Sequence, residues 1–428
     1  MFDIEKFYKA AVDGRNIEIE ELVAYLNSFN NLILWGAGNT GGQICRKLLD
    51  LGVEITCFWD KRSRELSHVS GVSVLENYTG GYDPDDTLVI ICITNGSLGD
   101  GWQSPELLSR GYSNIVEGVR LYEALICPFK AGDKLIHEVC LNNSICSMCN
   151  CRKYLGMIPR NFHNDGYEVV IQVATMIITR NCTLNCIYCG QQRNKYTNEQ
   201  RLSYAPIDDL KSDFDNFISA ADLVGMVSIV GGEAFLHPDL AELAQHCLRY
   251  ESFGCLNITT NGVCKMTKEM LQQMKDPRLK ISFSDYTANL TEKQKEVFHK
   301  NISLVKEAGI NLGIGVPLWT MPGTYECNNY ATDYMCERKR VCNSTRLASA
   351  IVDGYFVPCT TAEVTRGLDI LNYPDDYVSL RNNENVRKDL YRCLNNPYYE
   401  TCRYCPNEGG VSIPAGEQRD KVKPLLIQ

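Results

Sequence analysis

Residues 181–190 read NCTLNCIYCG and place three cysteines, Cys182, Cys186 and Cys189, in one short segment. The segment follows an apolar run at 173–180 that is typical of a buried strand. Iron–sulfur clusters are held by thiolates, usually four of them, so three thiolates in one loop leave one iron open. A structural zinc site is closed by four ligands, and no fourth ligand adjoins this segment. The triplet therefore predicts an iron–sulfur cluster with a free coordination position.

Downstream of the triplet, apolar runs alternate with helical patterns, two of which lie at 238–250 and 291–309. Repeated parallel units of this kind close into a full or partial barrel, and functional groups gather at the carboxyl ends of the strands. We therefore expect the loop with the triplet to lie at that end of the barrel. The expected strands are 173–180, 226–232, 255–262, 279–285 and 310–317.

Further short motifs lie on or after these expected strands, in order along the chain. Their residues are Tyr188, Gly231, Gly232, Glu233, Thr260, Asn261, Ser282, Ser284 and Gly315. Together with the CxxxCxxC spacing of the triplet, they resemble the signature of the radical SAM superfamily over roughly residues 170–320. A single CxxxCxxC arises by chance, whereas five motifs in register are specific.

The resemblance implies a 4Fe–4S cluster on the triplet and S-adenosylmethionine (SAM) at the open iron. It also implies that the carboxylate of Glu233 meets the methionyl ammonium group, that Ser282 or Ser284 contacts the ribose, and that the backbone near Gly315 meets the adenine. The cofactors would supply a 5′-deoxyadenosyl radical, and an electron donor such as flavodoxin or ferredoxin would reduce the cluster. The sequence names no catalytic acid or base.

A second group of cysteines lies in the C-terminal region, where 353–359 reads DGYFVPC and predicts a hairpin with Gly354 at its turn. Their spacing resembles the SPASM and twitch domains, which append auxiliary iron–sulfur clusters to radical SAM barrels. No cysteine follows Cys405, which favours the smaller twitch type with one auxiliary 4Fe–4S cluster. Four thiolates also suit zinc, which is the alternative. The preferred ligands are Cys342, Cys359, Cys402 and Cys405, with Cys336 and Cys393 as rivals.

The N-terminal region carries a glycine motif after its first expected strand, at 31–35. Gly36, Gly38 and Gly41 form GxGxxG at a helix start, and Asp60 ends the next strand, near the position that bonds a ribose hydroxyl. This pattern predicts a Rossmann-like doubly wound sheet. It also resembles the nucleotide-sugar-binding domains of bacterial sugar-modifying proteins, which implies a nucleotide or nucleotide-sugar ligand. The alternative is a scaffold that binds nothing.

The fold class expected for the whole chain is α/β. A Rossmann-like domain is expected at 1–126, a Cys-rich connector at 127–165, a partial (β/α)6 radical SAM barrel at 166–325, and a twitch- or SPASM-like iron–sulfur domain at 326–428. The connector contains four more candidate metal ligands. They are Cys140, Cys146, Cys149 and Cys151.

The chain has 428 residues and a net charge of −9. This charge gives no indication of a basic surface that would bind nucleic acid or an anionic membrane. No long apolar run predicts a transmembrane helix, and the N-terminus lacks the pattern of a signal peptide. These features predict a cytoplasmic location, where disulfides are rare. The 21 cysteines are therefore expected to include metal ligands rather than disulfides.

The expected function is a radical SAM oxidoreductase that acts on a small molecule, namely a sugar, cyclitol or nucleotide-sugar. It would dehydrogenate the substrate, with the auxiliary cluster as electron acceptor, or epimerise it with a hydrogen donor such as a thiol. The alternative is a SPASM-type peptide or protein maturase. The N-terminal domain favours the small-molecule hypotheses, because a maturase more often carries a peptide-recognition domain.

Overall fold

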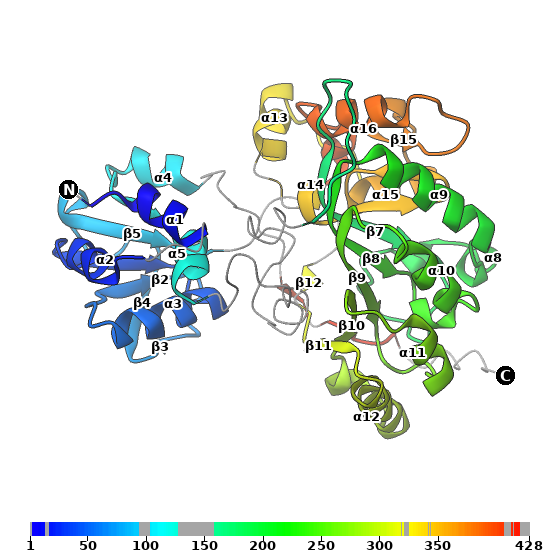
Figure 1. The fold of residues 1–428 in the computed structure, drawn as a ribbon, viewed down its shortest axis with the longest axis horizontal. Coiled ribbons are helices and arrows are strands. Elements are labelled where there is room, and N and C mark those ends of the chain that lie inside the picture. The colour runs from blue at the N-terminus through cyan, green and yellow to red at the C-terminus, as the bar shows by residue number, and fades with distance from the viewer. Residues whose placement is uncertain are drawn as a thin grey trace. The chain divides into compact units, whose positions relative to one another are not determined.

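The computed structural model describes residues 2–12, 17–93, 103–126, 158–317, 319–320, 325–340, 342, 344–405, 412–413 and 415–419. The described chain divides into two compact units, the first before residue 127 and the second from residue 158 onward. Both are α/β, as expected, and Figure 1 colours the first blue to cyan and the second green to red. The four candidate ligands of the connector lie outside the described residues.

The first unit is a six-stranded sheet in the order β3-β4-β2-β1-β5-β6. All pairs are parallel except β3 with β4, so the five parallel strands follow the spatial order 3-2-1-4-5 of a doubly wound sheet. Its strands are β1 (Asn31–Trp35), β2 (Cys57–Trp59), β3 (His68–Val69), β4 (Val72–Leu75), β5 (Thr87–Ile91) and β6 (Ile115–Glu117). Its helices are α1 (Ile4–Val12), α2 (Ile19–Leu26), α3 (Asn39–Asp50), α4 (Gln103–Ser109) and α5 (Gly118–Leu125).

Apolar side chains cover both faces of this sheet, which is why β1 and β5 are continuous apolar runs. On one face, Leu34 and Ile90 pack with residues of α1, α2, α3 and α5. On the other face, Ile33 and Trp59 pack with Leu107 of α4. The first unit therefore has helices on both sides of a parallel sheet.

The second unit is built on an eight-stranded sheet in the order β11-β10-β9-β8-β7-β13-β14-β15. Pairing is parallel from β11 to β13, and five of these six strands follow one another along the chain, close to where the apolar runs predict them. These five are β7 (Val170–Ile177), β8 (Leu223–Val230), β9 (Phe253–Thr260), β10 (Leu279–Ser284) and β11 (Asn311–Gly315).

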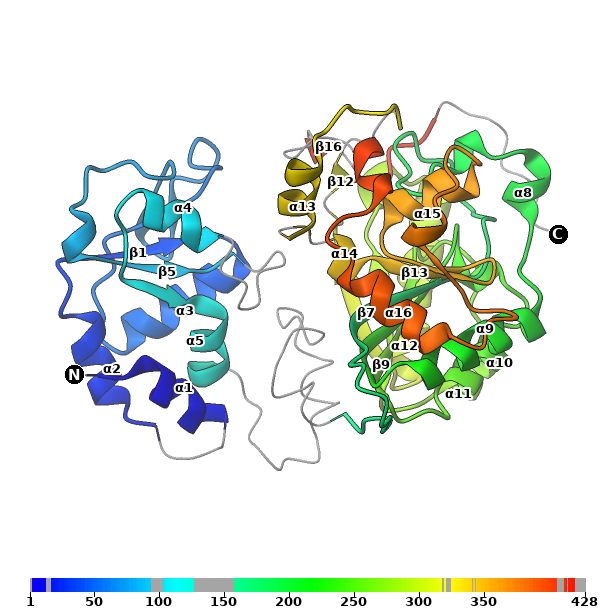
Figure 2. The ribbon, with the colours of Figure 1, turned by 90° about the horizontal axis from the view of Figure 1, so that it is seen from above.

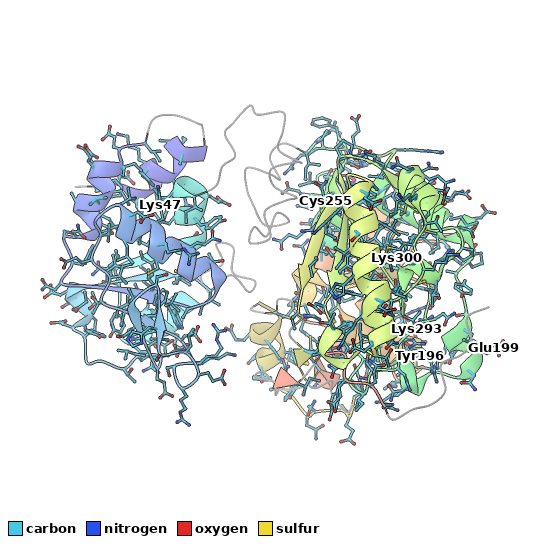
Figure 3. All side chains as sticks on the ribbon, turned by 90° about the horizontal axis from the view of Figure 1, so that it is seen from below. Lys47, Tyr196, Glu199, Cys255, Lys293 and Lys300 are labelled. Carbon is cyan, nitrogen blue, oxygen red and sulfur yellow. The ribbon has the colours of Figure 1, made fainter. Side chains whose placement is uncertain are left out.

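Helices cover the outer face of this curved sheet, where Figure 1 shows α9, α10, α11 and α12 beside the strands. Phe298 and Val305 of α12 are buried against the sheet, whereas Lys293 and Lys300 lie on its exposed side (Figure 3). Leu279 and Ile281 of β10 belong to the same core. The helices are α8 (Asn198–Leu202), α9 (Ile207–Ala220), α10 (Leu240–Cys247), α11 (Lys268–Met274) and α12 (Glu292–Glu307).

The C-terminal region extends this sheet. The expected hairpin is confirmed: β13 pairs antiparallel with β14 around Asp353 and Gly354, both of which have positive φ as a two-residue hairpin turn requires. Figure 2 shows α16 beside α9, so this region also packs on the helical layer. Its elements are α13 (Thr332–Arg340), α14 (Ser344–Leu347), β13 (Ser349–Val352), β14 (Tyr355–Val357), α15 (Thr360–Gly367), β15 (Val378–Ser379) and α16 (Val386–Asn395).

Two short strands, β12 (Trp319–Thr320) and β16 (Ser412–Ile413), form a separate antiparallel pair. They connect the end of the strand series to the last described residues of the chain. Among the helices in the described part of the chain, none combines the length and the apolarity that a membrane crossing requires.

Candidate functional site

A cavity of about 340 Å³ lies at the carboxyl ends of β7 to β10. One part of its lining is the loop after β7, and another part comes from β13 and α15. The cavity brings together most of the residues that the motifs single out, although they are up to 102 positions apart in the sequence. They are Cys182, Cys186, Cys189, Gly231, Gly232, Glu233, Thr260, Asn261 and Ser284.

The loop with the three cysteines is fixed to its neighbours by backbone contacts. The N–H of Glu233 donates to the carbonyl of Asn181 (2.7 Å), and Gly232 donates to Thr179 (2.8 Å). A Cβ at Gly232 would overlap the Asn181 carbonyl, so only glycine permits this approach. The buried guanidinium of Arg193 donates to the carbonyls of Arg180 and Leu184 and so spans the loop.

N–H groups point at two of the three sulfurs. Cys182 Sγ accepts from the Leu184 N–H (3.4 Å) and from Asn261 Nδ2 (3.6 Å), and Cys186 Sγ accepts from Gln418 Nε2 (3.3 Å). Burial raises the pKa of Cys182 to about 12 and that of Cys186 to about 11. A bound cationic group would therefore be needed to hold them as thiolates. Three thiols with N–H donors on one cavity wall fit a cluster with an open iron.

The carboxylate of Glu233 is 1% exposed and ties two strand ends together. Oε1 accepts from Thr260 Oγ1 (2.8 Å) and the Phe235 N–H (3.1 Å), and Oε2 accepts from the Asn261 N–H (2.8 Å). Burial raises its pKa, while these bonds favour the charged form. A carboxylate has about four acceptor positions, so about one remains, on Oε2.

Three of the residues predicted to bind SAM do not line the cavity. Ser282 lies inside the barrel one layer below Ser284, and its hydroxyl donates to Asn257 Oδ1 (2.6 Å). Gly315 lies at the exposed end of β11, and Tyr188 is only partly buried. Of the two serines, Ser284 is the one placed to contact a ligand in the cavity.

The part of the lining that comes from α15 carries a carboxylate that sequence reasoning missed. Glu363, on α15, is 3% exposed, and its Oε2 has no hydrogen-bond partner among the described residues. Burial raises its pKa to about 7, although Arg180 acts in the opposite direction. Arg180 Nη2 lies 3.9 Å from Oε1 and donates to Asp353 Oδ2 at 2.9 Å. Glu363 is therefore a buried carboxylate in the lining of the cavity, and its Oε2 has no hydrogen-bond partner among the described residues.

The four preferred auxiliary ligands lie in one neighbourhood. Burial raises the pKa of Cys359, and the nearby Cys342, Cys405 and Cys402 raise it further by like-charge repulsion. Cys359 begins α15, where its Sγ accepts from the Ala362 N–H (3.4 Å). Cys402 and Cys405 are held by the turn at Glu400–Tyr404.

The two rival cysteines are not among the groups that raise the pKa of Cys359. Cys393 is 1% exposed within α16, and burial, together with the Asp376 charge, raises its pKa to about 12. Cys336 lies on α13. Within the described residues, no three His, Cys, Asp or Glu side chains converge closely enough to bind a single ion. A zinc ion binds its ligand atoms at about 2.0–2.3 Å, so all of these atoms must lie around the position of the ion.

The three glycines of the motif in the first unit have different surroundings, as the glycines of a phosphate-binding turn do. Gly36 has a φ of +111°, and a Cβ there would lie 2.8 Å from Ile93. A Cβ at Gly41 would overlap the Gly36 carbonyl, whereas a Cβ at Gly38 would meet nothing within 4 Å. Of the three glycines, Gly38, at the start of α3, is the one that no described residue approaches, so it leaves room for a ligand.

Asp60 is already paired. Its carboxylate accepts from Nε and Nη2 of Arg62 (3.0 Å each) and from the Ala37 N–H (2.8 Å). These bonds outweigh burial and lower its pKa. A ribose hydroxyl could reach Asp60 only by displacing Arg62, whose side chain is 46% exposed. Asp60 therefore shapes the glycine turn in this structure.

The comparisons with known proteins fall on the second unit. Residues 176–326 match the model of the radical SAM superfamily. The chain is 30% identical to a GTP 3′,8-cyclase of Aquifex aeolicus over 138 residues, which are 31% of this chain and 41% of that protein. It is 31% identical to a GTP 3′,8-cyclase of Campylobacter jejuni over 167 residues, 37% of this chain and 49% of that protein. These matches span less than half of each relative.

Two solved structures are similar at low identity. BtrN in complex with AdoMet and 2-DOIA gives a TM-score of 0.36 at 17% identity, over 59% of this chain and 99% of that chain. The enzyme anSMEcpe with bound AdoMet and a Cp18Cys peptide gives 0.35 at 12% identity, over 54% and 82%. The family model implies a 4Fe–4S cluster and SAM as cofactors. Residues 176–326 of this chain are a radical SAM domain.

Proposed function

We propose that Cys182, Cys186 and Cys189 hold a 4Fe–4S cluster, that SAM binds beside it, and that the enzyme starts radical chemistry on a small polar substrate. The observation that carries this proposal is the convergence of the three thiols with Glu233 and Asn261 on one cavity. When bound, the cluster and SAM supply a 5′-deoxyadenosyl radical, which takes a hydrogen atom from an unactivated C–H bond.

Protein groups at the strand ends orient the cofactor. The remaining acceptor position of Glu233 would accept from the methionyl ammonium group, a charge-assisted bond to a carboxylate that is 1% exposed. Asn261 bridges Thr183 (3.0 Å) and Cys182 (3.6 Å), so it links the loop to the end of β9. Ser284 offers a hydroxyl on the same side of the cavity.

On the substrate side, Glu363 serves as the proton acceptor. Oxidation of a carbinol to a ketone releases a hydrogen atom from carbon, a proton from oxygen and one electron. The bound cofactor would supply the hydrogen-atom acceptor, and Glu363, whose Oε2 has no hydrogen-bond partner among the described residues and whose pKa burial raises to about 7, would take the proton. The electron goes to an acceptor held by the second group of thiols.

That second group, Cys342, Cys359, Cys402 and Cys405, holds an auxiliary 4Fe–4S cluster. Its support is the shared neighbourhood of the four thiols and the position of Cys359 four residues before Glu363. Four protein ligands close such a cluster, which suits it to electron transfer rather than to substrate binding. Zinc in the same site would leave the substrate electron without an acceptor.

The substrate class that best fits is a polyol: a sugar, cyclitol or nucleotide-sugar, oxidised or epimerised at a carbinol carbon. The curated relatives are named for action on GTP, which makes a purine nucleotide the second candidate. A peptide is the third, because anSMEcpe was solved with one. Gly38, open to a ligand at the start of a 12-residue helix, supports a nucleotide or nucleotide-sugar in the first unit.

The test is anaerobic reconstitution, reduction by flavodoxin or ferredoxin, and measurement of 5′-deoxyadenosine with SAM and each candidate substrate. We expect the three substitutions Cys182→Ala, Cys186→Ala and Cys189→Ala each to abolish 5′-deoxyadenosine formation. Cys255→Ala is the matched control: this buried cysteine of β9 lies well apart from Tyr196, which follows the loop (Figure 3). Full 5′-deoxyadenosine formation in any of the three variants would contradict the proposal.

Glu363→Gln separates the two halves of the site. We expect it to slow product formation with substrate at least about 100-fold, as loss of a general base does, and to leave the substrate-free cleavage of SAM unchanged. Deuterium transfer from a labelled substrate into 5′-deoxyadenosine identifies the carbon attacked. If the deuterium came from a peptide or from GTP, and not from a polyol, that compound would take the place of the polyol as the preferred substrate.

A further inference from the structure

Residues 415–419, near the end of the described chain, lie antiparallel to residues 185–187, which surround the second cysteine of the triplet. The Ile187 N–H donates to the Glu417 carbonyl (2.8 Å), and the Arg419 N–H donates to the Asn185 carbonyl (2.9 Å). Cys186 and Gln418 form an antiparallel bridge between these bonds. The pairing joins parts of the chain that are 232 positions apart. We name residues 415–419 the strap.

The strap is fixed on its other side by the cavity wall. Gly416 has a φ of +75° and packs on Tyr286, so closely that a Cβ would come within 2.5 Å of the ring. Asn289 Nδ2 donates to the Ala415 carbonyl (3.0 Å). Tyr286 itself lines the cavity and makes an edge contact with Trp319, with 5.7 Å between ring centroids. The strap therefore has a defined position against the cavity.

The side chain of Gln418 has only one consistent orientation. The backbone N–H of Asn185 can only donate, and it points at Oε1 (2.8 Å). The amide NH2 group must then face the other way, where Nε2 donates to Cys186 Sγ (3.3 Å) and to the Gly416 carbonyl (2.6 Å). Although an amide and its flipped form look alike, the hydrogen-bond network settles the choice here. An N–H donor is aimed at the sulfur of Cys186.

We propose that the strap tunes the cluster of the triplet, with Gln418 as the residue that sets its reduction potential through the N–H···S bond. This inference rests on the proposed function. Reduction adds negative charge to the cluster and its thiolates, and hydrogen bonds to the sulfurs stabilise that charge and raise the potential. The strap also covers one side of the loop and so limits water near Cys186, whose side chain is partly buried. Gln418 is thus a positioning residue that makes the cluster easier to reduce.

The experiment is a redox titration of the reconstituted full chain, followed by the electron paramagnetic resonance signal of the reduced cluster. Gln418→Leu removes the donor and keeps the bulk. We expect about a tenfold fall in the equilibrium constant for one-electron reduction, which is about 59 mV toward more negative potential. Gln418→Glu keeps the oxygen that accepts from Asn185, but puts a carboxylate oxygen beside the sulfur and the Gly416 carbonyl. It should shift the potential further in the same direction.

Gln273→Leu is the matched control, because Gln273 is exposed on α11 and its side chain makes no contact with the cavity. We expect its potential to equal that of the wild type. A potential unchanged from the control in both Gln418 variants would overturn the inference. Failure of the proposed function would look different: the wild-type protein would then bind no cluster at the triplet, or its signal would not change when SAM is added.

Discussion

Replacing Glu363 by glutamine should make the protein more stable at high pH and leave it unchanged at low pH. The carboxylate is 3% exposed, and Oε2 has no hydrogen-bond partner among the described residues. Arg180 lies 3.9 Å from Oε1, but its closer contact, at 2.9 Å, is with Asp353. Burial therefore costs the charged form more than Arg180 returns, and the pKa of Glu363 rises to about 7.

The sign and the size follow from proton linkage. Between its unfolded pKa of 4.5 and about 7, the folded protein holds a proton on Glu363 that the unfolded chain has already released. Stability therefore falls as the pH rises through this window. At about 1.4 kcal/mol per pH unit, the loss reaches about 3 kcal/mol above pH 7. Glutamine cannot ionise and avoids this loss, so the variant should gain up to about 3 kcal/mol at pH 8.

The assay is thermal unfolding of reconstituted wild type and Glu363→Gln at pH 5, 6, 7 and 8. The difference in melting temperature should be small at pH 5, about 1–3 °C, and grow to several degrees at pH 8, at about 2–4 °C per kcal/mol for a unit of this size. Glu199→Gln is the control: Glu199 is exposed on α8 at the edge of the unit (Figure 3), so its effect should stay within about 0.5 kcal/mol. A Glu363 difference that is constant from pH 5 to pH 8 would refute the reasoning.

Two further predictions concern the scaffold of the site. Arg381→Ala should lower the free energy of unfolding by about 2–3 kcal/mol, because Arg381 donates two hydrogen bonds (2.6 and 2.7 Å) to Asp213, which is 2% exposed and would be left buried without them. Thermal unfolding measures the loss. Asn301→Ala should lower the free energy of unfolding by about 2–4 kcal/mol and weaken SAM binding, because Asn301 donates to the carbonyls of Gly262 (2.8 Å) and Cys264 (2.6 Å), just after the end of β9. Thermal unfolding measures the first effect, and equilibrium binding of SAM measures the second.

Matched controls for these two variants lie on α16. Arg392→Ala removes an arginine that is 57% exposed and only loosely paired, and Asn395→Ala removes an exposed asparagine. Both should stay within about 0.5 kcal/mol of the wild type. An Arg381 variant as stable as the Arg392 variant, or an Asn301 variant with wild-type affinity for SAM, would contradict the corresponding prediction.

Much of the fold could be predicted because its signals are local. The run at 31–35 coincides with β1, and the five apolar runs of the second unit coincide with β7 to β11 within a few residues. In the first unit, three strands were missing from the prediction: His68–Val69, Val72–Leu75 and Ile115–Glu117. All three are short, and β4 alternates buried and less buried residues at the sheet margin, so none of them gives a continuous apolar run.

The site was predictable to the same extent. Residues at strand ends converge because parallel strands end at one edge, and this placed Glu233 and Asn261 in the cavity without any knowledge of contacts. Gln418 offered no local signal, because its partner lies 232 positions away. Glu363 had a weak local signal, because it follows Cys359 by four residues, which is about one helical turn. The same segment, however, also has the pattern of an ordinary amphipathic helix.

The N-terminal motif shows the limit of pattern reasoning. Its strand order and the roles of Gly36 and Gly41 agree with a nucleotide-binding turn. Asp60, which the pattern assigns to a ribose, instead pairs with Arg62 only two residues away. Asp60 and Arg62 are both visible in the sequence. A motif, however, gives only the positions of residues, and it does not tell whether a neighbouring guanidinium competes with a ligand for the carboxylate.

The central claim is that the triplet holds a cluster which cleaves SAM. The most direct measurement is iron content together with 5′-deoxyadenosine formation in reduced wild-type protein and in a variant with Cys182, Cys186 and Cys189 all changed to alanine. We predict about eight irons per chain and SAM cleavage in the wild type, and about four irons and no cleavage in the variant. Equal iron content in the two proteins, or SAM cleavage that survives the loss of all three thiols, would contradict the claim.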